Sequence, residues 1–545
     1  MNLLDLPAEI LLRIVYDIPS IQDKCQLLQT CTHFNILLSS HPTCWSRLDL
    51  SPFPSIHNTA LLTFFKNCGI SLAPFPSGND STSSVVSALD ISGCKGLSET
   101  MLQALSKTFT SLTELNINGY RLSNESEYDQ EQPRAFEQLR DHVFQVRPSH
   151  DLSSMTMDLS KRLVQQLKIP FILILDMLYP LHHLQSLSMQ YQELTPPRWL
   201  CKPFEQFRHI RHLDISSCIV SQPALQTLLR VVGSQLISLK MLNIDLTYLT
   251  ILSLGQHARN LECLHLSCDD QSQITAISNA IACMKNLKDF RLTRMRMGSL
   301  TAVIEQLNVD ILERLDLSPK MNIYLKPFAA RRQLPGQQQQ QQQQQQQMEL
   351  PQQRTNKHPI KTSVLPAANY ATIEHSLRLV DEAFPRLFQC QHLVELRLCF
   401  PAFRATTLHQ FCRSVTGSSL EIFELRLKTP QGDKDDDNYS LGIPLLVNLK
   451  ELYLYSVYLP VNSIRSIGSS LKKMTCLTIS DGGKWIEKTE LQAVLLRNLP
   501  LLRLFRLGKL SRPISTWPED VIVKRDNQSN IVFIKSYPER VWCVQ

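Results

Sequence analysis

Few residues in this chain have a type and spacing that could support chemistry. His209 and His212 form a His-x-x-His pair, but they flank an expected strand and so point different ways, with no third ligand nearby. The Gly482-Gly483-Lys484 triplet lacks the leading glycine and the following hydroxyl of a phosphate-binding loop. No Gly-x-Ser-x-Gly nucleophile motif is present. The sequence therefore predicts no metal site, no cofactor and no catalytic residue, and we expect that the protein is not an enzyme.

The cysteines and the apolar segments limit the compartment. Fifteen cysteines include no Cys-x-x-Cys pair, which favours free thiols in a reducing compartment. Asp5, Glu9 and Arg13 interrupt the start, so it does not have the pattern of a signal peptide. The longest apolar run, 169–175, is too short to span a membrane. We expect a cytoplasmic or nuclear protein, or one present in both, with no membrane partner.

The net charge is small and local. The chain has 545 residues and a formal charge of +7. The stretch from Lys326 to Lys361 has six cationic residues and one glutamate, which gives 6 − 1 = +5. Because most of the basicity lies in one segment, it is not the footprint of a nucleic-acid-binding surface.

A repeated apolar pattern supplies the elements that would position any site. From Leu89 onward the pattern Leu-x-x-Leu-x-Leu recurs, and outside two long gaps its copies are 22 to 29 residues apart. Each copy suits a short strand, and a segment of helical periodicity follows it. This period is typical of leucine-rich repeats, so we predict an α/β solenoid with one strand and one helix per repeat. The predicted second anchors of the pattern are Leu89, Leu115, Leu187, Leu213, Leu242, Leu264, Phe290, Leu315, Leu396, Phe423, Leu452, Leu477 and Phe505.

The gaps in this pattern define the expected domains. The first repeat block is 48–325, starting in the strand Leu48 to Leu50, with polar loop insertions near 71–84 and 121–150. Leu152-x-x-Met155-x-Met157 resembles a degenerate repeat in the first gap. Residues 326–375 include eleven consecutive glutamines, 337–347, and are predicted to be a disordered linker. The second block is 376–545, and its end is predicted to be a capping hairpin.

Residues that alternate with the buried anchors would line the concave face. In the first half they are mostly Asp90, Asn116, Asn118, Ser188, Asp214, Asn243 and Asp245. In the second half they become cationic and aromatic: Arg291, Arg314, Arg397, Arg426, Tyr453, Tyr455 and Arg506. Arginine and tyrosine are favoured interface anchors, so this set is predicted to bind a protein substrate that is acidic or phosphorylated. The alternative is a solvated face on which Glu395, Glu424 and Glu451 neutralise the arginines.

The first fifty residues predict three short helices. Ile10, Leu11, Ile14, Val15 and Ile18 recur at helical spacing and form one apolar face. Three such helices have too small a core to be stable alone, so their apolar faces must be shared with another structure.

This stretch resembles an F-box. The resemblance covers residues 1–50 and depends on Leu6-Pro7-x-Glu9-Ile10-Leu11, Pro19, Cys31, Phe34, Pro42, Trp45 and Leu48. It implies that Leu6, Pro7, Ile10 and Leu11, with Ile14 on the same helix, bind a Skp-type adaptor and through it a cullin. The chain would then be a non-catalytic substrate-recognition subunit of a ubiquitin ligase. The alternative is a leucine-rich-repeat scaffold outside ubiquitin transfer, whose first helices only cap the solenoid.

Overall fold

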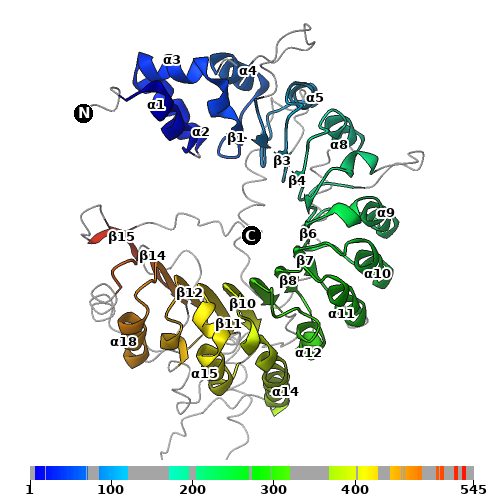
Figure 1. The fold of residues 1–545 in the computed structure, drawn as a ribbon, viewed down its shortest axis with the longest axis vertical. Helices are drawn as coiled ribbons and strands as arrows, with labels where there is room; N and C mark the ends of the chain where they lie inside the picture. Colours follow the sequence, from blue (N-terminus) through cyan, green and yellow to red (C-terminus); the bar gives the residue numbers. More distant parts are fainter. Residues whose placement is uncertain are drawn as a thin grey trace, which may run out of the picture.

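The fold is a curved array of repeats in which strands line the inner side and helices the outer side (Figure 1). The computed structural model describes 6–18, 20–68, 70, 85–120, 171–194, 204–268, 273–295, 297–318, 367–400, 403–427, 442–455, 457, 461–480, 499–502, 504–508, 521–525 and 531–535. The arc brings the N-terminal helices and the last strands to the same side of the molecule (Figure 1). This arrangement is a leucine-rich-repeat solenoid, as the period predicts.

Fourteen strands pair in chain order and in parallel to form one sheet. In every strand whose side chains are described, the side chain at one shared register position is buried. This shared position explains why the apolar pattern recurs in the sequence. The strands are β1 (Arg47–Asp49), β2 (Ala88–Asp90), β3 (Glu114–Asn116), β4 (Ser186–Ser188), β5 (His212–Asp214), β6 (Ser238–Met241), β7 (Cys263–Ser267), β8 (Asp289–Thr293), β9 (Arg314–Ser318), β10 (Glu395–Phe400), β11 (Ile422–Leu427), β12 (Glu451–Tyr455), β13 (Cys476–Ser480) and β14 (Leu504–Gly508).

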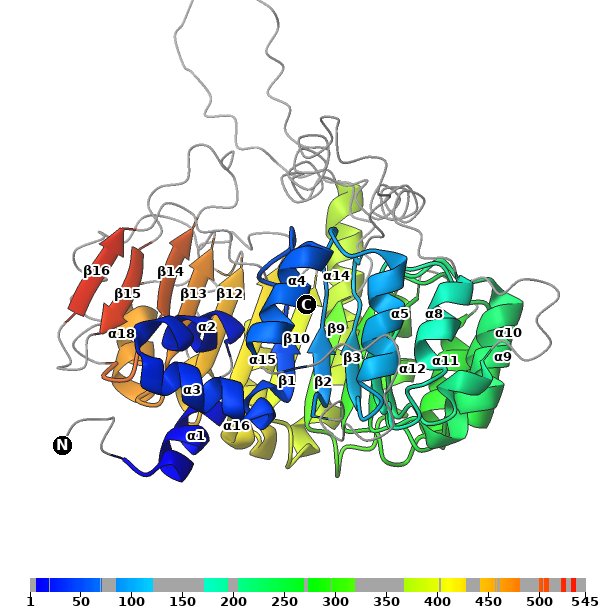
Figure 2. The same ribbon diagram turned by 90° about the horizontal axis from the view of Figure 1, so that it is seen from above.

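Helices connect successive strands on the outer side (Figure 2). In α9, Pro223 lies in the first turn, while Leu225, Leu228, Leu229 and Val232 form the buried face at helical spacing. The α-helices are α1 (Ala8–Tyr16), α2 (Ile21–Thr30), α3 (Thr32–Ser40), α4 (Asn58–Asn67), α5 (Glu99–Thr108), α8 (Phe171–Leu178), α9 (Gln222–Val232), α10 (Tyr248–His257), α11 (Ile274–Cys283), α12 (Leu300–Ile304), α14 (Ala367–Ala383), α15 (Ala405–Arg413), α16 (Val415–Ser419) and α18 (Val461–Ser470). Short 3-10 turns are η2 (Pro42–Trp45), η4 (Glu205–Phe207), η5 (Gly233–Gln235), η7 (Met297–Ser299), η8 (Phe384–Gln389) and η9 (Ile443–Leu445).

One predicted anchor is wrong. Leu239, not Leu242, pairs with Leu213 on one side and Leu264 on the other. The sequence around it matches the repeat pattern twice, three residues apart, and the copy with Leu236, Leu239 and Met241 is the one that is fully buried. Asn243 and Asp245 therefore lie beyond the strand, and Lys240 occupies the concave position of this repeat.

The strands on either side of each long gap in the pattern pair directly with each other. Leu115 of β3 pairs directly with Leu187 of β4. Leu315 of β9 likewise pairs directly with Leu396 of β10. The predicted linker ends too late, because α14 already begins at Ala367. The insertions at 71–84 and 121–150, residues 152–157 and the glutamine tract lie outside the described residues.

The N-terminal helices share a core with the first repeat, whose strand is β1, as predicted, and whose helix is α4. The Trp45 side chain is fully buried, and its Nε1 donates to the Leu38 carbonyl oxygen at 3.2 Å. Its ring meets the Phe64 ring of α4 edge-on, with centroids 5.4 Å apart. The buried Lys24 Nζ donates to the Cys44 carbonyl oxygen at 2.8 Å. These contacts fix the helices rigidly on the start of the solenoid.

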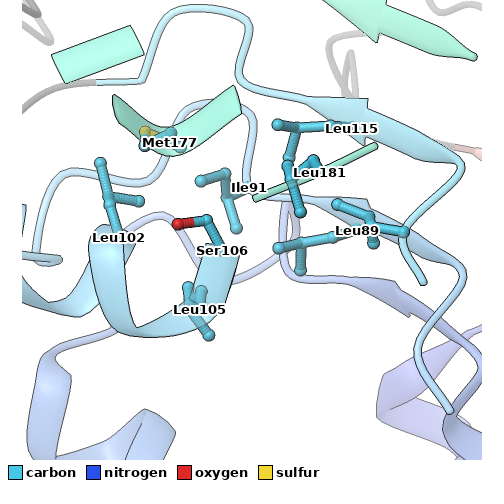
Figure 3. A pocket seen from close by; sticks show the side chains of 9 residues that line it. Leu89, Ile91, Leu102, Leu105, Ser106, Leu115, Met177 and Leu181 are labelled. Carbon is cyan, nitrogen blue, oxygen red and sulfur yellow. The ribbon is translucent and has the colours of Figure 1, made fainter. Parts of the chain in front are cut away.

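A small apolar cavity lies beneath α5 and α8, against β2 and β3 (Figure 3). Leu89, Leu102, Leu115 and Met177 are among its lining side chains, and its volume is about 10 Å³. A cavity of this size and polarity stays dry and admits no ligand. It is a packing defect of the core and not a site.

The C-terminal prediction of a hairpin is confirmed. β15 (Val521–Arg525) and β16 (Ile531–Lys535) pair antiparallel, with Val523 opposite Phe533. The pair lies beside β14 at the end of the sheet (Figure 2).

Candidate functional site

An exposed apolar stripe runs along α1. Pro7 is exposed, and Ile10 and Ile14 are 46% and 43% exposed. Their spacing of three and four residues places them on one side of the helix. Leu11, by contrast, is 1% exposed and packs with Val15 in the molecule's own core, so its predicted contact with an adaptor is corrected to a structural role.

Leu6 has an intermediate position. It is half-buried and packs against the shared core, in front of the helix that Pro7 precedes. Of the five residues predicted to contact an adaptor, Pro7, Ile10 and Ile14 are therefore the accessible ones.

The concave face is organised in three rows of side chains. We define the leading row as the residue before each anchor, the central row as the residue after it, and the distal row as the residue two further on. Arg314 is in the leading row, Arg291, Arg397, Tyr453 and Arg506 are in the central row, and Arg426 and Tyr455 are in the distal row. The side chain of Arg506 lies outside the described residues. The arginines thus do not line up across neighbouring strands.

Carboxylates of neighbouring strands meet the arginines of the central and leading rows. Arg291 Nε lies 2.9 Å from Asp316 Oδ2, and Arg314 Nη1 lies 3.3 Å from Asp289 Oδ2. Burial raises the pKa of Asp316, and the charge of Arg291 only partly offsets that effect. The Arg291–Asp316 pair is thus mostly desolvated, as its exposed fractions of 17% and 16% also indicate.

Arg397 and Arg426 converge on one anionic group, and that group is the chain's own Glu424. Arg397 Nη1 lies 3.5 Å from Glu424 Oε2, and Arg426 Nη2 donates to Glu424 Oε1 at 3.1 Å. Arg397 also pairs with Glu395 at 2.5 Å. The Arg426 guanidinium stacks 4.4 Å above the centre of the Tyr455 ring.

The charges on the concave side of β8–β12 fit the alternative of a face on which carboxylates neutralise the arginines. The four arginines are outnumbered by five carboxylates, which gives 4 − 5 = −1. The carboxylates belong to Asp289, Asp316, Glu395, Glu424 and Glu451. Tyr453 donates to Glu451 Oε2 at 2.8 Å, so this tyrosine too is held by a carboxylate. A ligand would meet paired charges of both signs.

The first half of the concave face is hollowed beside the N-terminal helices. A hollow of about 610 Å³ lies between α1 and α2 and the strands β1–β4. Lys24 and Arg47 line it together with four carboxylates, a local charge of 2 − 4 = −2. The carboxylates are those of Asp17, Asp49, Asp90 and Glu114.

Three possible ligating groups that the sequence did not single out lie together where the first and second halves of the concave face meet. His265 Nε2 lies 3.1 Å from Asp289 Oδ1 and 3.6 Å from Cys263 Sγ. Burial lowers the pKa of His265, but its hydrogen bonds with Asp289 and Cys263 outweigh that and raise it to about 9. Burial also raises the pKa of Asp289, yet His265 and Arg314 bring it below its ordinary value. Among the residues that the structure describes, no other group of three meets the spacing of metal ligands.

The pairing that creates this cluster was available in the repeat alignment. Cys263 and Asp289 each precede an anchor, and His265 follows one, so correct register places all three together. The His209 and His212 side chains, which the sequence singled out, are both exposed and belong to no such group.

Comparisons with known proteins leave the family open. No protein-family model and no curated protein matches the chain. Among solved structures, a chain in the crystal structure of the Rad7 and Elc1 complex in yeast matches with 13% identity and a TM-score of 0.40, over 90% of this chain and 94% of that one. The leucine-rich repeat-containing protein LegL7 from Legionella pneumophila matches with 13% identity and a TM-score of 0.32, over 59% of this chain and 91% of that one.

A chain of the TLR13–ssRNA13 complex matches with 10% identity and a TM-score of 0.30, over 79% of this chain and 57% of that one. Likeness at this level carries no inference about partners, so the assignment of the solenoid depends on the strand registers of this chain. No helix in the described segments is long and apolar enough to cross a membrane.

Proposed function

We propose that this protein is a non-catalytic substrate-recognition subunit of a Skp–cullin–F-box ubiquitin ligase. Its α1 surface binds a Skp-type adaptor, and its concave face holds the target protein. Ubiquitin transfer is carried out by other subunits, and this chain contributes by keeping the target close to them.

The accessible stripe of Pro7, Ile10 and Ile14 is the observation that carries this proposal. Isoleucines at this exposure, side by side on one helix, favour a partner that removes them from water. The same helix is anchored from behind by Leu11 and Val15, so the stripe is held in a fixed orientation. The order and spacing of the F-box-like residues point to the adaptor as that partner.

The target surface is proposed on β9–β12. Arg314, Arg397, Arg426, Tyr453 and Tyr455 lie on the concave side there, and Arg506 is at the corresponding position in the sequence of β14. Arg291 is mostly buried against Asp316 and supports this surface from its edge. Because carboxylates already pair with the arginines, a target binds by exchanging partners at Glu424 and Glu395, which an acidic or phosphorylated segment can do.

Pull-down of a purified Skp-type adaptor by the full chain tests the proposal. Ile10→Glu combined with Ile14→Glu should weaken binding about 30-fold or more, since truncated interface anchors cost about 2 kcal/mol or more. Leu249→Glu, at an exposed leucine of α10 far along the solenoid, is the matched control and should bind like the parent. Equal adaptor binding by all three proteins would contradict the assignment.

The alternative function is a repeat scaffold outside ubiquitin transfer. The burial of Leu11, Val15 and Trp45 favours it to the extent that these helices also cap the first repeat. If the protein is such a scaffold, the variant with Ile10→Glu and Ile14→Glu keeps its target partners. The parent protein then does not retain the adaptor in the pull-down at all.

A further inference from the structure

Two distances among the Cys263, His265 and Asp289 groups are close to those between ligands around a tetrahedral cation. Bonds of about 2.3 Å to sulfur and about 2.0–2.2 Å to nitrogen and oxygen, at the tetrahedral angle, place sulfur and nitrogen about 3.6 Å apart and nitrogen and oxygen about 3.4 Å apart. The observed distances are 3.6 Å between Sγ and Nε2 and 3.1 Å between Nε2 and Oδ1. All three atoms lie within 4.8 Å of one another.

The chemistry of the arrangement distinguishes it from a nucleophile with a proton relay. In a Cys–His–Asp relay, the thiol and the carboxylate would contact opposite nitrogens of the imidazole. Here Cys263 Sγ and Asp289 Oδ1 both converge on the same atom, Nε2 of His265. The thiol and the carboxylate therefore lie next to the same nitrogen of the imidazole. Three ligand atoms gathered in this way suit a shared cation better than the passage of a proton.

We propose that Cys263, His265 and Asp289 form a zinc site on the concave face. Thiolate and imidazole ligands favour Zn²⁺ over Mg²⁺ or Ca²⁺. The cysteine binds as a thiolate and His265 binds as neutral imidazole, so the thiol proton and the imidazolium proton both pass to water. Three protein ligands leave a fourth position for a water molecule or for a side chain of a bound protein.

The surroundings fit the ligand roles. Arg314 Nη1 lies 3.3 Å from the other oxygen of Asp289, which orients that carboxylate as a second shell does in metal sites. The His265 and Asp289 side chains are mostly buried yet keep 14% and 22% exposure, which leaves an entry path. Zn²⁺ takes the place of the two protons that Cys263 and His265 release, so its binding adds no net charge beside Lys240 and Arg314.

Metal titration of the purified full chain, first freed of metal with a chelator, tests the site. Co²⁺ should give the visible absorption and thiolate charge-transfer bands of a tetrahedral site, and Zn²⁺ should abolish both by displacement. Cys263→Ala and His265→Gln should each reduce bound Zn²⁺ by one equivalent. Cys283→Ala, at an exposed cysteine of α11, and His212→Gln, at an exposed histidine of β5, are the controls and should keep it.

Asp289→Asn separates coordination from hydrogen bonding. An amide still hydrogen-bonds His265 but is a poorer ligand, so Zn²⁺ affinity should fall at least tenfold while the circular dichroism spectrum of the metal-free protein stays that of the parent. If the parent binds no more Zn²⁺ than Cys263→Ala, or shows no thiolate band with Co²⁺, the three groups are only a hydrogen-bonded ladder and the proposal is overturned. The result does not depend on adaptor binding, so it is distinguishable from failure of the proposed function.

Discussion

The two halves of the concave face use polar side chains for different purposes. On β1–β5, Asp49, Asp90, Asn116 and Asp214 each accept a hydrogen bond from the backbone N–H two residues later. These strands have three residues each, and after β4, which has Ser188 in this position, the Gln190 N–H donates instead to Asn118 Oδ1 of the preceding repeat at 2.6 Å. On β8–β12, the central row consists of Arg291, Asp316, Arg397, Glu424 and Tyr453, and the strands have five or six residues.

The difference teaches how a side chain sets strand length. A short Asp or Asn side chain bonds its own backbone and turns the chain out of the strand. Arginine, glutamate and tyrosine do not form this turn: Arg291 and Arg397 reach a carboxylate on the next strand, whereas Tyr453 donates to Glu451 on its own strand. Asp316 is the instructive exception, because Arg291 takes its Oδ2 and the Ser318 hydroxyl its Oδ1, and β9 continues to Ser318. The second half thereby gains the distal row that holds Arg426 and Tyr455.

The largest expected effect is loss of the desolvated pair in the second half. Arg291→Ala should lower the free energy of unfolding by about 2 kcal/mol or more, because it leaves the Asp316 carboxylate buried without its cation. Arg47→Ala removes the exposed first-half pair with Glu114, which is 2.7 Å long, and should cost less than about 1 kcal/mol. Chemical denaturation followed by circular dichroism compares them. Equal losses would erase the distinction between the halves.

A smaller effect is expected on target capture. Arg397→Glu with Arg426→Glu should weaken capture of a co-purifying target about tenfold, since both guanidinium groups on the target surface are lost. Asp90→Lys with Asp214→Lys changes charge on the first half and should leave capture nearly unchanged. Quantitative affinity capture measures both, and phosphatase treatment of the target asks whether phosphate is needed.

Capture that survives both the arginine reversal and the phosphatase would mean that these arginines only neutralise their own carboxylates. Arg397→Gln with Arg426→Gln is the neutral companion, because glutamate beside Glu424 adds repulsion within the chain.

Removing one backbone-capping side chain should cost less again. Asp90→Ala loses its bond to the Ser92 N–H at 2.8 Å and its bond to Asn116 Nδ2 at 2.7 Å, which together should cost about 1 kcal/mol. Tyr453→Phe in the second half loses its partly exposed bond to Glu451 and a weak one from Cys476 Sγ at 3.6 Å, and should cost less. Thermal melts of the two variants check the order, and a greater loss for Tyr453→Phe would reverse it.

The smallest effect is expected from deleting residues 333–359. The segment is rich in glutamine and has little apolar surface to bury, and the flanking strands β9 and β10 pair directly. The melting temperature should stay within about 2 °C, since a change of 1 kcal/mol shifts the midpoint of a large domain by about 2–4 °C. A fall of many degrees would show that the segment packs on the repeats.

Sequence alone could predict the strands because the anchors are a local pattern. Leu213 or Phe290 needs only its own apolar neighbours to be recognised, and Leu242 failed only because two overlapping matches compete there. Exposure of Ile10 and burial of Leu11 could not be separated from sequence, since both lie on the apolar side of α1.

The charged and ligating contacts were harder to predict because they join different repeats. Arg426 has its cation–π partner, Tyr455, on the next strand, and Cys263 and Asp289 are one repeat apart. Such contacts follow from register, so an error of three residues at Leu239 displaced the expected surface in that repeat.

The direct pairing of β9 with β10 has a consequence for the folding kinetics. Neighbouring anchors such as Leu89 and Leu115 are 115 − 89 = 26 residues apart, whereas Leu315 and Leu396 are 396 − 315 = 81 apart. Closing the longer loop costs about 1 kcal/mol more in chain entropy, and so does the similar step from Leu115 to Leu187. Nucleation therefore spreads readily within β1–β3, β4–β9 and β10–β14 but slows at the two junctions, so hydrogen exchange should divide the array into three cooperative units there.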